Sequence, residues 1–156
     1  MTVAAGEPSV APAYFDAALV AKFYLNEPGR AAVRGLARAS GVVMSSGIAV
    51  AEVSAAFHRK LREEAVTAAV FRALQGQFVH DVDEGLWKLA DPTAALLRDV
   101  QTALTRLHRA VFVRSLDAIH LVTARAEGFE RVYSNDRHLL AAAKSFGLEG
   151  VNPISR

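Results

Sequence analysis

Short apolar runs alternate with longer helix-like stretches along this chain of 156 residues. The apolar runs at residues 13–15, 42–44 and 132–133 are typical of buried strands. Apolar residues recur at helical spacing in the stretches that follow the first two runs, at residues 19–24 and 48–57. Strands that alternate with helices in this way predict a three-layer α/β/α sandwich with a mainly parallel central sheet.

The middle of the chain is punctuated by polar residues. The stretch His80–Gly85 reads as a connector, and Trp87 and Leu89 after it predict a short edge strand. Asp91 and Pro92 then predict a helix start, with Asp91 as the N-cap and Pro92 at the first helical position. A last short strand is expected near residue 151.

Length and composition favour one domain. A chain of this length buries roughly two-thirds of its unfolded surface, so its core needs no disulfide. The absence of cysteine excludes thiolate zinc sites and a thiol nucleophile, and it fits the reducing cytoplasm, where we expect the protein. No apolar stretch is long enough to span a membrane, so we expect no membrane partner. We predict a flexible lead-in at residues 1–12 and a single domain over residues 13–156.

Four acidic residues stand beside the predicted strands: Asp16, Glu52, Asp117 and Asp136. Ligands of open parallel sheets bind beyond the carboxyl ends of the strands, so these side chains are expected to meet there. Carboxylates gathered at one point repel one another unless protons or cations neutralise them. Because hard divalent ions prefer oxygen ligands, the set predicts a Mg²⁺ or Mn²⁺ site for phosphate chemistry.

Each acid also has a structural interpretation. Asp16 and Asp136 could be ordinary N-caps, and Asp117 could stabilise the positive end of a helix dipole by roughly 0.3–1 kcal/mol. Glu52 projects from a face of small apolar residues, where a charge needs a partner. Arg59 or a metal ion could supply that partner. The shared placement of the four acids at strand exits favours a functional cluster.

Four segments of the chain resemble the motifs of PIN-domain ribonucleases, and most closely the VapC-type toxins. They are residues 14–24, 46–57, 115–121 and 134–139, and each contains one of the four acids. The resemblance implies a PIN-like fold and a Mg²⁺- or Mn²⁺-dependent endoribonuclease in which Asp16, Glu52, Asp117 and Asp136 are the catalytic and metal-binding residues. It also implies an RNA substrate, a cognate antitoxin and a homodimer.

One departure from the family pattern concerns the first motif. The family usually has a hydroxyl residue one or two positions after the first aspartate, where this chain has Ala17 and Ala18. Loss of such a supporting group commonly weakens metal binding or activity by ~10–100-fold. The alternative is therefore a catalytically weak or inactive PIN-like module that binds RNA or protein, unless Ser134 or Asn135 compensates.

Substrate binding must rest on local positive charge, because the net charge of the chain is only +2. Arg59 and Lys60 follow the second motif, and Arg137 and His138 stand beside Asp136. We expect these four residues to contact RNA phosphates, which position a nucleic acid without reading its bases.

Overall fold

Five parallel strands form the centre of the protein in the computed structural model, which describes residues 11–154. The strands are β1 (Ala13–Tyr14), β2 (Val43–Ser46), β3 (Trp87–Ala90), β4 (Arg131–Tyr133) and β5 (Glu149–Val151). β2 pairs with both β1 and β3, and β4 pairs with β5. A parallel bridge between Phe15 and Tyr133 joins β4 to the end of β1, which gives the order β3-β2-β1-β4-β5. β3 is thus the predicted edge strand.

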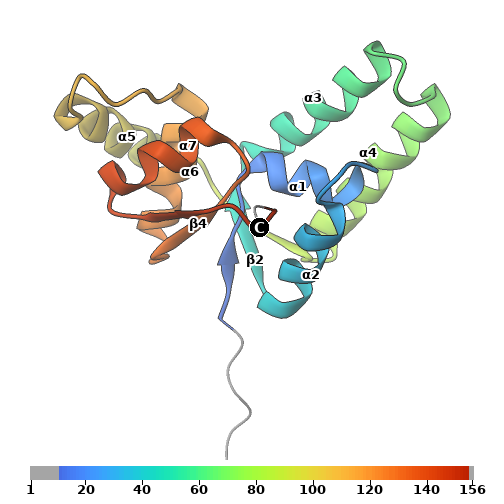
Figure 1. Ribbon diagram of the computed structural model, residues 1–156, viewed down its shortest axis with the longest axis horizontal. Helices are drawn as coiled ribbons and strands as arrows, with labels where there is room; N and C mark the ends of the chain where they lie inside the picture. Colours follow the sequence, from blue (N-terminus) through green and yellow to red (C-terminus); the bar gives the residue numbers. More distant parts are fainter. Residues whose placement is uncertain (1–10, 155–156) are drawn as a thin grey trace, which may run out of the picture.

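Helices cover both faces of the sheet (Figure 1). They are α1 (Ala17–Tyr24), α2 (Arg30–Ser40), α3 (Ala49–Arg62), α4 (Ala68–Asp83), α5 (Ala94–Arg106), α6 (Ser115–Ala126), α7 (Arg137–Ala143) and the short 3₁₀ helix η1 (Lys144–Phe146). The core on one face is built with α1–α4, and the core on the other with α5–α7 and η1. This arrangement confirms the predicted α/β/α sandwich.

Alternating side chains of the strands supply these two cores. In the first strand segment, Ala13 and Phe15 belong to the core under α1–α4, whereas Tyr14 between them belongs to the other. Val43 and Met44 divide in the same way on β2. Successive residues of a strand point to opposite faces, so a strand covered on both faces must be apolar at every position. This explains the uninterrupted apolar runs in the sequence.

Two local predictions were wrong. His80–Asp83 forms the last turn of α4 instead of a connector, and Asp81 accepts a 2.6 Å hydrogen bond from the Tyr24 hydroxyl. The polar residues there belong to a helix whose end is fixed by a tertiary contact. Asp91 is not the cap of α5, because Thr93 takes that role and its hydroxyl accepts the Leu96 amide at 3.1 Å.

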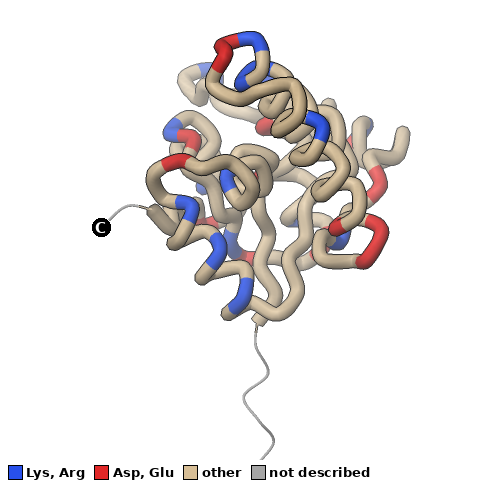
Figure 2. The backbone as a smooth tube through the Cα atoms, turned by 90° about the vertical axis from the view of Figure 1, so that its right-hand side faces the viewer, with Lys and Arg blue, Asp and Glu red and all other residues tan. Residues whose placement is uncertain are grey.

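The parallel arrangement brings the ends of β1, β2 and β4 to one edge of the sheet, where α1, α3 and α7 begin. Lys and Arg residues are interspersed with Asp and Glu along the chain when it is viewed from the side (Figure 2). None of the helices within residues 11–154 has the length and apolarity to cross a membrane. The predicted lead-in, residues 1–12, lies outside the described residues except for its last two.

Candidate active site

The four acidic side chains singled out by the sequence line one hollow of about 490 Å³. Asp16 follows β1, Glu52 lies in the first turn of α3, Asp117 in the first turn of α6, and Asp136 is the N-cap of α7. Asp16 and Asp117 are buried, and Glu52 and Asp136 are partly exposed. Folding thus brings together four residues that lie far apart in the chain.

Asp16 uses its two carboxylate oxygens for different purposes. Oδ1 accepts the Leu19 amide at 3.0 Å and so caps α1, whereas Oδ2 accepts a hydrogen bond from the Ser134 hydroxyl. Burial raises the pKa of Asp16 to about 6, although the nearby His120 and the hydrogen bond from Ser134 pull it down. The structure therefore places a hydroxyl from the fourth motif beside the acid whose own motif lacks one.

Asp136 divides its oxygens in the same manner. Oδ1 caps α7 by accepting the amide of His138 at 2.8 Å, and Oδ2 accepts from the guanidinium of Arg114. Partial burial alone would raise the pKa of Asp136, but the hydrogen bonds from Arg114 and from the backbone amides outweigh it, so the pKa is lowered. The interpretation as an N-cap and the placement in the acidic hollow are both correct for this residue.

Arg114 links two of the four acids. Its Nε donates to Oδ2 of Asp117 at 2.7 Å, and its terminal nitrogen donates to Asp136. These two carboxylates raise the pKa of the Arg114 guanidinium, which stays charged. Sequence reasoning missed Arg114, although its position three residues before Asp117 at a helix start was a usable signal.

A buried histidine holds Glu52. Nε2 of His120 lies 2.8 Å from Oε2 of Glu52, and Nδ1 lies 3.0 Å from the hydroxyl of Tyr14. Burial raises the pKa of the Tyr14 phenol, which stays a neutral donor. With a proton on Nε2, His120 donates to the Glu52 carboxylate, while its Nδ1 and the Tyr14 hydroxyl share the second hydrogen bond. The side chain that contacts Glu52 is therefore His120 and not the expected Arg59, while a metal ion as the partner of Glu52 stays a prediction.

The four predicted RNA-binding residues differ in their placement. Arg59 lines the acidic hollow, and the backbone amide of His138 contacts Asp136. Arg137 is exposed at the start of α7, between Asp136 and His138 in the sequence. Lys60 instead pairs with Glu27 at 2.7 Å. Three of the four are therefore at or beside the acids, and Lys60 is held in a salt bridge.

The donor set of the hollow matches the preference of a hard divalent ion for oxygen ligands. Within residues 11–154 no three Asp, Glu or His side chains are close enough to hold one ion as they stand. Arg114 provides the positive charge for Asp117 and Asp136, whereas burial raises the pKa of Asp16 and the nearby His120 and Ser134 offset this only in part. A cation bound by these oxygens would relieve that imbalance, so the residues fit such an ion.

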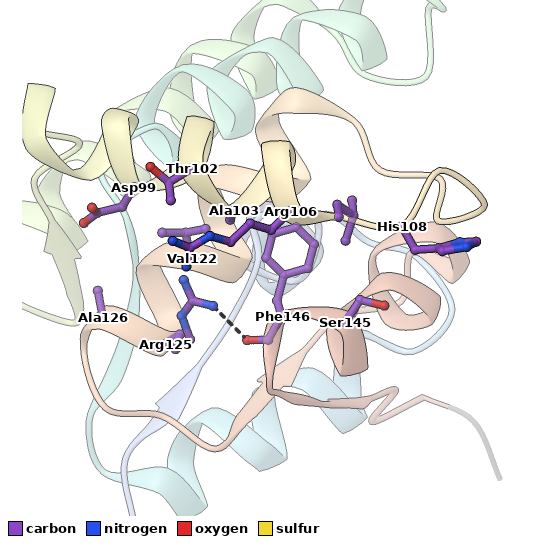
Figure 3. A pocket seen from close by; sticks show the side chains of 11 residues that line it. Asp99, Thr102, Ala103, Arg106, His108, Val122, Arg125, Ala126, Ser145 and Phe146 are labelled. Carbon is purple, nitrogen blue, oxygen red and sulfur yellow. Dashed lines mark hydrogen bonds between the residues drawn. The ribbon is translucent and has the colours of Figure 1, made fainter.

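A second, larger hollow of about 570 Å³ lies between α5, α6 and η1 (Figure 3). Arg106 and Arg125 line it, and Nη1 of Arg125 donates to the backbone oxygen of Phe146 at 3.5 Å. Asp99 is the one carboxylate among its lining residues. A single carboxylate cannot form the predicted cluster, so the four predicted acids meet in the smaller hollow and not in this one.

Known proteins resemble the chain over most of its length. The profile of the PIN domain family matches residues 13–145. The crystal structure of VapC20 from Mycobacterium tuberculosis, a toxin that cleaves the Sarcin-Ricin loop, superposes with a TM-score of 0.64 at 18% sequence identity. This superposition covers 83% of this chain and 93% of VapC20. No curated protein sequence shows significant similarity to the chain. The resemblance to the family is thus confirmed, and the fold is that of VapC20.

Proposed function

Since the chain belongs to the PIN domain family, we propose that it is a metal-dependent endoribonuclease that hydrolyses RNA phosphodiester bonds. The observation that carries the proposal is the convergence of Asp16, Glu52, Asp117 and Asp136 on one hollow. Carboxylates contributed by four separate segments would repel one another in a merely structural site. A site that handles divalent cations and phosphates explains why they are together.

The four acids would hold one or two Mg²⁺ or Mn²⁺ ions, directly or through water. Such an ion lowers the pKa of a bound water and stabilises negative charge on a phosphate. The protein's own groups orient the ligands: Ser134 fixes Asp16, and His120 fixes Glu52. Arg114 is half-exposed and charged, so it can also meet a phosphate oxygen at the mouth of the hollow.

The biological role that we propose is that of the toxin in a toxin–antitoxin pair. The support is the fold shared with VapC20, itself a toxin. The partners would be a cognate antitoxin and a second copy of this chain, and the setting would be the cytoplasm. Phe23, Leu36 and Phe71 are only partly buried on α1, α2 and α4, so apolar surface remains on these helices for a partner segment.

The test of the nuclease proposal is cleavage of total cellular RNA by the purified protein in a titration with Mn²⁺ and Mg²⁺. We expect cleavage that EDTA abolishes and that Asp117→Asn reduces to background. Asp99→Asn is the matched control, because Asp99 is exposed on α5 and lines the other hollow. Equal cleavage by Asp117→Asn and the wild type would contradict the proposal.

The rival function is a PIN-like module that binds RNA or protein without efficient cleavage. The observation in its favour is the pair Ala17 and Ala18, which replaces the usual hydroxyl residue. RNA binding by the wild type at every metal concentration, with no cleavage above that of Asp117→Asn, would establish this module and reject the enzyme.

A further inference from the structure

Phe112 is an aromatic ring exposed to solvent beside the candidate active site. It lies in the loop between α5 and α6, where Val111 and Val113 on either side are partly buried against the core. Phe112 between them is exposed, so its ring faces the solvent. Phe112 is 59% exposed, and the other large exposed hydrophobic residues within residues 11–154 are all valine or leucine.

The ring of Phe112 is held in place against His138. The two ring centroids are 4.7 Å apart, with an angle of 57° between the planes. His138 lies in the first turn of α7, and its amide donates to Oδ1 of Asp136. Two residues after Phe112, Arg114 contacts Asp117 and Asp136. Arg114 and His138 thus connect this loop at two points to Asp136, which lines the acidic hollow, and the pair of rings lies beside that residue.

We propose that Phe112 and His138 form a stacking platform for an unpaired base of the RNA substrate. This proposal rests on the proposed function and adds the ring pair of Phe112 and His138 to the same site. Unpaired bases stack on phenylalanine and histidine rings, and each such contact is worth about 1–3 kcal/mol. A base on the platform would place its own phosphate near Arg114 and the four carboxylates, which are the groups that would act on that phosphate.

The same geometry disfavours a continuous duplex. In an A-form helix the base faces are stacked on one another, and a protein reaches mainly phosphates and 2′-hydroxyls. The exposed ring of Phe112 cannot stack on phosphates or hydroxyls, so a continuous duplex offers it no stacking partner. The platform therefore selects RNA whose target nucleotide is unstacked, such as a loop or a single-stranded segment.

The test uses short RNA oligonucleotides that carry 2-aminopurine, a base whose fluorescence is quenched by stacking, in an unpaired or a paired position. Binding is measured with the full chain carrying Asp117→Asn, so that no cleavage intervenes. We expect quenching of the unpaired probe and a Kd that Phe112→Ala raises by about 5- to 100-fold. Phe112→Trp should retain quenching, whereas Phe112→Leu, which is apolar but lacks a ring, should not.

Leu97→Ala is the control, because Leu97 is a comparably exposed apolar residue on α5. Equal Kd and quenching for Phe112→Ala and its parent would overturn the platform. So would restoration by Phe112→Leu, or a loss of self-association with unchanged RNA binding, since either result would make Phe112 a protein contact. If cleavage depends on Asp117 but not on Phe112, the platform proposal fails and the nuclease proposal stands. If the probe stacks on Phe112 but the wild type does not cleave RNA, the nuclease proposal fails instead.

Discussion

Nε2 of the buried His120 lies 2.8 Å from Oε2 of Glu52 and joins α6 to α3 across the acidic hollow. On its other side the same imidazole contacts the Tyr14 hydroxyl on β1 at 3.0 Å. A carboxylate that is only partly buried would otherwise be free to rotate. The contact selects the orientation in which Glu52 faces the other acids.

Substitution of His120 tests this orienting role. Glutamine can place its amide nitrogen where Nε2 lies, whereas asparagine can reproduce only the contact toward Tyr14. We therefore expect His120→Gln to retain more RNA cleavage and more Mn²⁺ affinity than His120→Asn, with a loss of ~10–100-fold for asparagine. Calorimetric titration with Mn²⁺ measures the affinity of each variant, and thermal unfolding measures its stability. Equal Mn²⁺ affinities for the two variants would show that His120 contributes only to stability.

Replacement of Arg114 by alanine should tighten divalent-ion binding. The guanidinium now occupies oxygens of Asp117 and Asp136 that an ion would use. Without it those carboxylates repel each other and attract a cation more strongly. Ion pairs of a half-exposed guanidinium are weak, so we expect the two together to be worth about 1 kcal/mol and the Kd for Mn²⁺ to fall by about 5-fold. The Mn²⁺ affinity of Arg114→Lys should lie between those of the wild type and Arg114→Ala. Weaker Mn²⁺ binding by Arg114→Ala than by the wild type would contradict this prediction.

The stability of the metal-free protein should depend on Asp16. Its pKa rises from an ordinary 3.8 to about 6 in the folded state, so the folded protein binds this proton more tightly than the unfolded chain does. The resulting stabilisation is complete below pH 4 and is lost as the pH rises through 6, by about 3 kcal/mol in all. Denaturant unfolding in EDTA at pH 4 to 8 measures it.

Asp16→Asn is the matched variant, because it removes this titration while keeping an oxygen to accept the Leu19 amide. The difference in unfolding free energy between wild type and variant should change across pH 4 to 6 and stay level above pH 7. Saturating Mg²⁺ should reduce the amount of unfolding free energy that the wild type loses as the pH rises. An identical pH dependence in both proteins would show that Asp16 titrates normally.

Ser134 should carry the supporting role that the first motif lacks. Its hydroxyl donates to Oδ2 of Asp16, so Ser134→Ala leaves a buried carboxylate oxygen without a partner. We expect RNA cleavage to fall by ~10–100-fold. Ala18 is exposed and lines the acidic hollow, so Ala18→Ser can restore a hydroxyl there. Recovery of activity in the double variant checks the assignment, and full activity of Ser134→Ala would refute it.

Substitution of Tyr24 tests its contacts with Trp87 and Asp81, which the sequence did not predict. Its hydroxyl accepts from Nε1 of Trp87 and donates to Asp81, each at 2.6 Å. Tyr24→Phe leaves the buried indole donor unsatisfied, which costs about 1–3 kcal/mol of unfolding free energy. Chemical denaturation measures this loss. Gln77→Ala, which removes only an exposed contact to Asp81, is the control and should change stability much less.

The sequence by itself determined the layered α/β fold, the parallel strands and the acids that follow strands, Asp16, Glu52 and Asp136. The expected strand exit was wrong for Asp117, because α6 follows α5 and the described residues between these two helices contain no strand. These follow from periodicity and from the position of each residue relative to its own strand, which are local properties of the chain. The N-cap of α5 is Thr93, two residues after the predicted Asp91. Local patterns do not decide between them, because several neighbouring side chains can satisfy the same helix end.

Only the tertiary structure decided which groups meet the acids. His120 reaches Glu52 across 68 positions of sequence, and Ser134 reaches Asp16 across 118. Arg114 contacts Asp136 from another element, and the ring of Phe112 rests on His138. Such partners are chosen by the distances that packing sets between elements, and a single sequence does not encode those distances in any local pattern.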